Sequence, residues 1–438
     1  MTINTDMSSP DTDLSSTYRV RRPSIFSRIR VQLGIGLLIA CVLPWLLRVD
    51  LAIANRVTLA SQINSLIATC AALIVGYFIV RRLTRYPGIR SMSYVLPVFA
   101  ISYGIALSLI LLFRVDYSRL FLLFSFVAAQ IWFHIIIYFA DRNTILTFDV
   151  IPVGNANKLC DISGVTWNML TRPKLSGVPT HGIAADLRSD LSSDWESFIA
   201  DSAVNGIPVY HHKQLSENLT GKVEIEHLSE NNLGSLLPSY FYLRFKQSID
   251  IIGVLLFLPI ALPLFALIAL AIKKDSKGPV FFRQDRMGYH GKVFRVWKFR
   301  TMEPFHSTDV SEREASITAN DDERVTRVGA FLRKSRLDEL PQILNILRGE
   351  MSWIGPRPEA LALSRWYEAD IPFYRYRHIV RPGITGWAQV NQGHVAHVDG
   401  VRDKLHYDFY YIKYFSVWLD ILITMRTIAT MLTGFGAR

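Results

Sequence analysis

Four long apolar runs follow one another in the first third of the chain. Each comes close to the ~20 consecutive apolar residues that a helix needs to cross the hydrocarbon core of a bilayer. The first begins too far from Met1, and is followed by too many further runs, to be a cleaved signal peptide. The pattern predicts a four-helix transmembrane bundle within residues 26–141, with helices at approximately Val31–Leu47, Val57–Val80, Met92–Phe113 and Leu120–Ala140.

The composition agrees with a membrane protein. Hydrophobic residues make up 50% of the 438 residues and charged residues only 19%, which is too apolar for an ordinary soluble protein. The net charge is +11, and basic residues beside a bilayer more often face anionic lipid or phosphorylated substrates than nucleic acid. We therefore expect no nucleic-acid partner. The three cysteines form neither a disulfide framework nor a zinc pattern.

The placement of arginine predicts the orientation of the spans. Positively charged loops are retained on the cytoplasmic side of a membrane. The segment before the first run and the second connection are both rich in arginine, so both are expected inside, and four crossings return the chain to the cytoplasm at Asp141. Residues 1–25 are expected to be a disordered polar and basic N-terminus. The arginines are Arg19, Arg21, Arg22, Arg28 and Arg30, then Arg81, Arg82, Arg85 and Arg90.

Residues 142–237 have the composition of a soluble domain. Short β-rich runs alternate with polar stretches such as SSDWESFIADSAVN, which is typical of an α/β domain. The β-rich runs are ILTFDVIPV, GVTWNML, GIPVY and KVEIEHL. No GxGxxG motif follows any of them, so nothing argues for a bound dinucleotide. We expect a small cytosolic α/β domain, Rossmann-like in class, whose role the sequence does not indicate.

Residues 238–274 hold a fifth apolar segment. Pro259 and Pro263 lie in its middle, where each removes a backbone donor and crowds the preceding turn. Basic residues flank both ends, and a helix that enters the membrane, breaks at the prolines and returns keeps both basic clusters in the cytoplasm. A re-entrant helix is therefore predicted. The alternative is a kinked spanning helix, which would place everything after it outside the cell.

Residues 275–438 carry the densest chemistry. The run RQDRMGYHGKVFRVWKFRTM contains six cations and a single acid, Asp285. Its part from Lys292 to Phe299 has the β-branched and aromatic character of a strand, preceded by a turn at Gly288–Gly291. The segment from Phe415 to Gly434 is apolar with Asp420 and Arg426 interrupting it. It is expected to be an interfacial or packing helix rather than another span.

The stretch RKSRLDELPQ, which begins at Arg333, places two adjacent carboxylates between cations and a proline. From the residues alone, Asp338 is interpreted as a helix N-cap, with Pro341 in the first turn of the helix. That interpretation leaves Glu339 without a role. Neighbouring helical residues point about 100° apart, so adjacency does not by itself give the two carboxylates a common task.

Several long motifs follow one another in this part of the chain: NDDERVTRVGAFLRKSRLDELPQILNILRGEMSWIGPRPE, RPGITGWAQVN and YDFYYIKYFSVWLDIL. With the fifth apolar segment, they make the chain resemble the bacterial sugar transferase family, the polyprenyl-phosphate hexose-1-phosphate transferases. The four spans and the α/β domain are similar to the larger, multi-span members. The resemblance implies a monotopic phosphoglycosyl transferase catalytic domain of the α/β class with a C-terminal interfacial helix, on the cytoplasmic face of a bacterial inner membrane.

The resemblance also implies a reaction. A hexose 1-phosphate would pass from a UDP-sugar to undecaprenyl phosphate with release of UMP, forming a polyprenyl-diphosphate sugar. This is the first membrane step of exopolysaccharide or capsule synthesis. Asp338 would be the nucleophile that forms a covalent aspartyl phosphosugar intermediate, and Glu339 would assist as metal ligand or base. The donor stays open between a plain hexose such as glucose and an N-acetylated sugar, and the competing class is a non-enzymatic membrane tether of polysaccharide assembly.

Attack at phosphorus brings negative charges together, so such a site needs cations and usually a divalent metal. Mg²⁺ bound by the oxygens of Asp338 and Glu339 is the expected cofactor. The resemblance places phosphate-binding arginines at two positions, and for each the alternative is a surface salt bridge. One of them, Arg357, lies between two prolines on a stiff backbone. The predicted phosphate-binding set is Arg333, Arg357, Lys298 and Arg300.

Three further expectations concern partners and departures from the family pattern. Inner-membrane lipid, a second copy of the chain and later glycosyltransferases of the pathway are the expected partners. Arg336 stands two residues before Asp338, where relatives usually have a small residue. After GWAQVN the chain continues with Gln392, Gly393 and His394, where many relatives have Gly-Arg. In the YDFYY motif, Tyr410 and Tyr411 are interpreted as packing residues.

Overall fold

The computed structural model describes residues 28–46, 56–83, 92–141, 146–225, 238–303, 324–392 and 398–433. The chain divides into two compact units, Met1–Thr220 and Gly221–Arg438, and each is described by itself. The predicted disordered N-terminus, residues 1–25, lies outside the described residues.

All four predicted spans are helical. The first run forms α1 (Ile29–Leu37), passes through a π-helical turn η2 (Leu38–Val42), and ends at Leu46. Each of the four is long and apolar enough to cross a membrane, and α4 contacts both α3 and α5. Large apolar side chains remain exposed outside this packing, with Leu112 at 73%, as expected for helices surrounded by lipid. The remaining helices are α3 (Arg56–Leu83), α4 (Met92–Leu112) and α5 (Arg119–Asp141).

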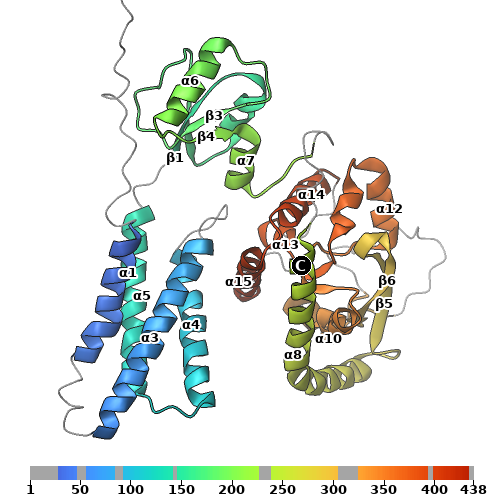
Figure 1. Ribbon diagram of the computed structural model, residues 1–438. Coiled ribbons are helices and arrows are strands. Elements are labelled where there is room, and N and C mark those ends of the chain that lie inside the picture. Colours follow the sequence, from blue (N-terminus) through green and yellow to red (C-terminus); the bar gives the residue numbers. More distant parts are fainter. Residues whose placement is uncertain are drawn as a thin grey trace, which may run out of the picture. The chain divides into compact units, whose positions relative to one another are not determined.

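The predicted α/β domain follows these helices. Its four strands form one parallel sheet in the order β2-β1-β3-β4. The 3₁₀-helix η3 (Gly154–Asp161) and α7 (His212–Thr220) contribute apolar side chains to one face of the sheet, and α6 (Ser193–Val204) covers the other (Figure 1). The strands are β1 (Leu146–Val150), β2 (Val165–Met169), β3 (Ile183–Ala185) and β4 (Val209–His211).

Two details of this domain differ from the sequence analysis. The short strand β3 was not predicted, because three small or branched residues give too little pattern to distinguish a strand. The run KVEIEHL was predicted to be β-rich, but its described part, residues 222–225, is not a strand. These residues belong to the second unit instead: Val223 N donates to His406 O at 3.0 Å, and beside them Trp387 Nε1 donates to Gly221 O at 2.9 Å.

The fifth apolar segment forms α8 (Tyr240–Asp275). The predicted break at Pro259 and Pro263 is not found. The helix continues through both prolines and turns sharply partway along (Figure 1). The first arm packs through Val254 on Ile343, and the second arm packs through Ile268 on residues of the same unit. In a straight helix residues 254 and 268 would lie about 21 Å apart along the axis, so the bend brings both arms onto one unit.

The rest of the second unit is built on the hairpin of β5 (Phe281–Met287) and β6 (Val293–Phe299), which confirms the predicted strand and the turn before it. Two short parallel strands, β7 (Ser352–Ile354) and β8 (Gly383–Thr385), form a second sheet. The helical elements between and after them are α10 (Arg327–Ser335), η6 (Leu337–Gln342), α11 (Ile343–Leu347), α12 (Leu361–Asp370), η7 (Tyr374–Ile379), α13 (Trp387–Gln392), α14 (Val398–Lys413) and α15 (Val417–Thr433).

The C-terminal helix α15 is a packing helix. It lies against β7, β8 and α13 and buries Leu419, Leu422 and Ile423. The two tyrosines of the YDFYY motif also pack, as predicted: Tyr410 stacks on a tryptophan ring, and the hydroxyl of Tyr411 lies 2.9 Å from Oδ1 of Asp420 on α15.

Candidate active site

The helix that leads to the two carboxylates, α10, is fixed to the end of α8. Thr326 is its N-cap, and its hydroxyl accepts a hydrogen bond from Gly329 N at 2.9 Å. Asp275, the last residue of α8, accepts a second one from Val328 N at 3.1 Å. Leu332 packs on Ile268 of α8. The membrane segment and α10 are therefore one packed body.

A left-handed residue ends α10. Arg336 has φ 55° and ψ 19°, a conformation that costs a residue with a Cβ atom roughly 1–2 kcal/mol. Its N–H donates to Arg333 O at 3.1 Å, and its carbonyl accepts from Glu339 N at 3.3 Å. The reversal separates α10 from η6. The prediction that Asp338 is a helix N-cap is wrong. Arg336 occupies the N-cap position of η6, and Asp338 lies inside this helical turn.

Glu339 is held by two cations. It is only 6% exposed, and its Oε1 lies 3.0 Å from Nζ of Lys298 and 2.5 Å from Nη2 of Arg357. Nη1 of Arg357 also donates to Oε2 at 3.4 Å. Burial alone would raise the pKa of Glu339, but the positive charges of Arg357 and Lys298 outweigh it and hold the pKa well below its usual range. Glu339 is therefore a fixed, neutralised anion.

Asp338 has a different environment. Successive residues of a 3₁₀-helix point about 120° apart, so the side chains of Asp338 and Glu339 leave η6 in different directions. It is half-buried, and none of the ion pairs formed within the described part of the chain includes it. Burial and the negative charge of Glu339 raise the pKa of Asp338, and nearby cations offset this only in part. Two adjacent carboxylates are thus given opposite electrostatic settings, which is how sites assign different roles to like groups.

Arg357 is positioned through its own backbone. Its carbonyl accepts a hydrogen bond from Nη2 of Arg377 at 2.9 Å, and the carbonyl of Pro358 accepts one from Nη1 of Arg286. Arg377 is 3% exposed and also binds Oδ2 of Asp408 at 2.8 Å. The loop that presents Arg357 is therefore held by two guanidinium groups, of which that of Arg377 is buried, and Asp408 of the YDFYY motif holds Arg377 in place.

Sequence reasoning missed these supporting residues. Arg286 was one of six cations in its run, with nothing local to distinguish it, and burial together with the charge of Arg357 lowers its pKa to about 10. Arg377 lies outside every motif used above. Glu359 ends the IGPRPE motif but was also not predicted as a supporting residue. Burial would raise the pKa of Glu359, but the charges of Lys404 and Arg377 outweigh burial and lower it. Only their distance from Arg357 in space identifies them.

The other predicted phosphate-binding residues are placed differently from one another. Lys298 and Arg357 meet at Glu339. Arg333 is half-buried, its Nε donates to Oγ1 of Thr301 at 3.0 Å, and its charge acts on Asp338. Arg300 is directed elsewhere: its guanidinium donates to the carbonyls of Ser276 and Lys277 at 2.8 Å and so holds the end of α8. A phosphate-binding role for Arg300 stays a prediction that these contacts do not favour. Gly393 lies outside the described residues.

Oxygen ligands suited to Mg²⁺ are present at the site, since Asp338 and Glu339 supply carboxylates and a diphosphate substrate would supply more. The two oxygens of Glu339 face Lys298 and Arg357. A metal-ligand role for Glu339 thus requires one of these ion pairs to open, whereas the Asp338 carboxylate carries no such pair among the described residues.

The strain at Arg336 gives a stability prediction. Replacing Arg336 by glycine is expected to stabilise the protein by about 1 kcal/mol, because glycine adopts the left-handed conformation without a Cβ clash. Arg336→Ala is the matched control: it removes the same side chain but keeps the Cβ atom. The difference in thermal unfolding midpoint between the two variants measures the strain, and equal midpoints would show that the residue is not strained.

Comparison with known proteins places the chain in a family. The family model described as bacterial sugar transferase matches residues 241–434. A UDP-N-acetylgalactosamine-undecaprenyl-phosphate N-acetylgalactosaminephosphotransferase from Aeromonas hydrophila is 43% identical over 86% of this chain and 89% of its own length. UDP-glucose:undecaprenyl-phosphate glucose-1-phosphate transferases from Escherichia coli and Klebsiella pneumoniae are 44% and 45% identical, each over 42% of this chain and 39% of their own length. The chain therefore belongs to the bacterial sugar transferase family and is a membrane-associated phosphoglycosyl transferase.

Proposed function

We propose that this protein transfers a sugar 1-phosphate from a UDP-sugar to undecaprenyl phosphate, releasing UMP. The observation that carries the proposal is the division of roles between the adjacent carboxylates: Glu339 is neutralised by direct ion pairs with Lys298 and Arg357, while the charge of Asp338 is offset only in part by nearby cations. The printed names of the relatives supply the two substrates. A family member with both features has what phosphoryl transfer through a covalent intermediate requires.

In the first half-reaction, a carboxylate oxygen of Asp338 attacks the β-phosphorus of the UDP-sugar. A P–O bond to Asp338 forms as the P–O bond to UMP breaks, and UMP leaves with the electron pair. The raised pKa of Asp338 makes its carboxylate a better nucleophile than that of Glu339. Lys298, Arg333 and Arg357 lie near enough to act on Asp338 electrostatically, and the same charges would balance those of the diphosphate.

In the second half-reaction, an oxygen of undecaprenyl phosphate attacks the same phosphorus. The P–O bond to Asp338 breaks, the carboxylate is restored, and the product leaves as a polyprenyl-diphosphate sugar. The acceptor is a lipid, and α8 carries a row of exposed apolar side chains that includes Leu256 at 74% and Leu267 at 65%. Since α10 is packed on the second arm of α8, the surface that would hold the lipid and the turn that carries Asp338 belong to one body.

Mg²⁺ is the proposed cofactor, held by Asp338 together with the diphosphate, with Glu339 as a further ligand if one of its ion pairs opens. When bound, the ion would screen the negative charge of the diphosphate. The cations at Glu339 perform part of the same task from the protein side.

The donor we propose is UDP-N-acetylgalactosamine. The Aeromonas hydrophila relative, named for that donor, matches both units of this chain, whereas the Escherichia coli and Klebsiella pneumoniae relatives named for UDP-glucose match only 42% of it. UDP-glucose is the second candidate, because identity over the shared segment is equally high. Membranes containing the protein should release UMP from one of these donors in the presence of undecaprenyl phosphate and Mg²⁺. Release from neither, under conditions where a known relative is active, would contradict the proposed reaction.

We further propose that the second unit lies on the cytoplasmic face of the inner membrane and that α8 is re-entrant. The support is that both arms of α8 pack on the same unit, which a helix crossing the membrane would not allow. An epitope tag after Arg438 should be protected from added protease in intact spheroplasts and cleaved after lysis. Cleavage in intact spheroplasts would instead favour the spanning alternative. Association with a second copy or with later glycosyltransferases stays a prediction.

A further inference from the structure

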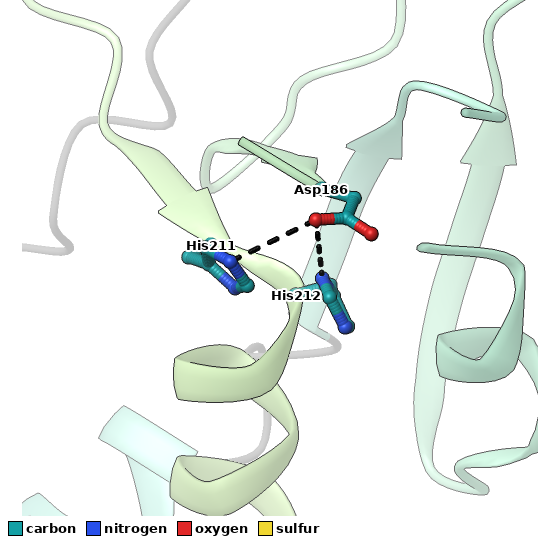
Figure 2. Close-up of side chains that lie close together, drawn as sticks. All are labelled: Asp186, His211 and His212. Carbon is teal, nitrogen blue, oxygen red and sulfur yellow. Dashed lines mark ion pairs between the residues drawn. The ribbon is translucent and has the colours of Figure 1, made fainter. Parts of the chain in front are cut away.

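A second cluster of chemically active side chains lies in the α/β domain, within the first unit. Asp186 follows directly after β3, His211 is the last residue of β4, and His212 begins α7. Oδ1 of Asp186 lies 3.8 Å from Nε2 of His211 and 3.6 Å from Nδ1 of His212. Figure 2 shows the carboxylate directed at both imidazole rings. One carboxylate oxygen and two imidazole nitrogens thus lie within 4.8 Å of one another.

The cluster occupies the position where an open parallel sheet usually binds a ligand. β1 is flanked by β2 on one side and β3 on the other, so the strand order reverses between β1 and β3. Ligands of such sheets bind outside the carboxyl ends of the strands at this reversal. Asp186 lies at the end of β3, and the start of η3, which follows β1, meets it there: Asn155 N donates to Oδ2 of Asp186 at 3.0 Å. A Cβ atom on Gly154 would lie 2.5 Å from the same oxygen.

One imidazole nitrogen of the cluster is not explained by internal hydrogen bonding within the described residues. Nε2 of His211 is enclosed and has no hydrogen-bond partner within the described part of the chain, and 3.8 Å to Asp186 is too long for a hydrogen bond. The two rings are stacked with centroids 4.6 Å apart. Two imidazolium cations at that separation would repel, so at least one ring is neutral, and neutral imidazole is the form that binds metal ions.

From this geometry we propose that Asp186, His211 and His212 form a binding site for a divalent transition metal of the zinc class. Two imidazole nitrogens and one carboxylate oxygen are a known donor set for Zn²⁺, with water as the fourth ligand. Ligand atoms about 2.1 Å from a tetrahedral metal lie about 3.4 Å apart. The two distances to Asp186 are 3.6 and 3.8 Å, and the three ligand atoms lie within 4.8 Å of one another, so side-chain rotations would bring them to that value. The metal would join the ends of β3 and β4 to the start of α7.

Binding changes the tautomer of one ring. Lys213 N donates to Nδ1 of His211 at 3.1 Å, so the neutral ring carries its proton on Nε2. Coordination through Nε2 leaves the proton on Nδ1 and releases the Lys213 N–H to solvent. No net proton is lost from this ring. The site uses none of the residues assigned to sugar transfer, so it is an additional ligand site.

The test measures Zn²⁺ binding by the full chain, purified in detergent without a histidine tag and dialysed against excess Mg²⁺ so that oxygen-only sites are filled with Mg²⁺. We expect one tightly bound Zn²⁺ per chain and slower amide exchange in peptides covering residues 183–189 and 207–216. Asp186→Asn and His211→Gln should each weaken Zn²⁺ binding by about 100-fold or more, since even residues that only support ligands are worth about 10–100-fold.

Two controls separate this site from others. His290→Asn removes an exposed histidine of the second unit, and Asp338→Asn removes the proposed nucleophile; both should bind Zn²⁺ like the parent. Asp186 also accepts two backbone hydrogen bonds, so a folding defect in its variant is checked against His211→Gln, whose side chain is partly exposed. The proposal is overturned if the parent retains no Zn²⁺, if His211→Gln binds it as tightly as the parent, or if Asp338→Asn loses it.

Discussion

Replacing Asp338 by asparagine is expected to reduce UMP release by about 10⁴-fold or more, the scale seen when a covalent nucleophile is removed. The amide of asparagine is nearly isosteric with the carboxylate but cannot form the acyl phosphate. Incubation of the parent with a UDP-sugar in the absence of undecaprenyl phosphate should leave a phosphosugar on the protein, detected as a mass increase on the peptide that contains Asp338. The variant should show neither UMP release nor this mass increase.

Asp285→Asn is the matched control for this experiment. Asp285 also lies in the second unit, but it is on the exposed part of β5 and pairs with Arg295 at 3.1 Å. Because exposed ion pairs contribute about 0–1 kcal/mol, this variant should retain parental activity. If Asp338→Asn released UMP at even a tenth of the parental rate, at the same protein concentration, Asp338 would not be the nucleophile. Glu339 would then have to be reconsidered despite its neutralised state.

Replacing Arg357 by lysine is expected to lower kcat/KM for the UDP-sugar by about 10²-fold, and replacement by alanine by about 10³-fold. Lysine keeps the positive charge but loses the planar fork that contacts both oxygens of Glu339. Steady-state UMP release over a range of donor concentrations checks both values. Arg295→Ala is the control, since Arg295 is a 69% exposed arginine of the same unit and its loss should change little.

Arg357 acts on phosphate directly or by holding Glu339, and a double-mutant cycle separates these two routes. If the effect passes only through Glu339, then Glu339→Gln and Arg357→Lys together should be no worse than the more severe single variant. A direct contact with phosphate predicts a further loss in the double variant. Parental kcat/KM in Arg357→Lys would show that the fork geometry has no part in the reaction.

The extent of the helices could be predicted from the sequence because each depends on a local pattern. The four apolar runs are helical over nearly the predicted residues, with α4 covering Met92–Leu112 against the predicted Met92–Phe113. The strand before Phe299 was also predictable, as were the packing roles of Tyr410 and Tyr411. A bend of α8 could be predicted from Pro259 and Pro263, but a helix that stays continuous through the bend could not. The helix remains continuous because its second arm packs on the same unit as the first.

The sequence by itself determined the residue types of the site: two adjacent carboxylates, an arginine between prolines and a surplus of cations. Only the tertiary structure decided which carboxylate is neutralised, because Glu339, Lys298 and Arg357 are brought together from three separate segments. It also showed Arg300 bound to the carbonyls of Ser276 and Lys277, and it supplied Arg286 and Arg377, which no motif indicated. Charge interactions depend on distance and burial, and a linear sequence contains neither until the chain has folded.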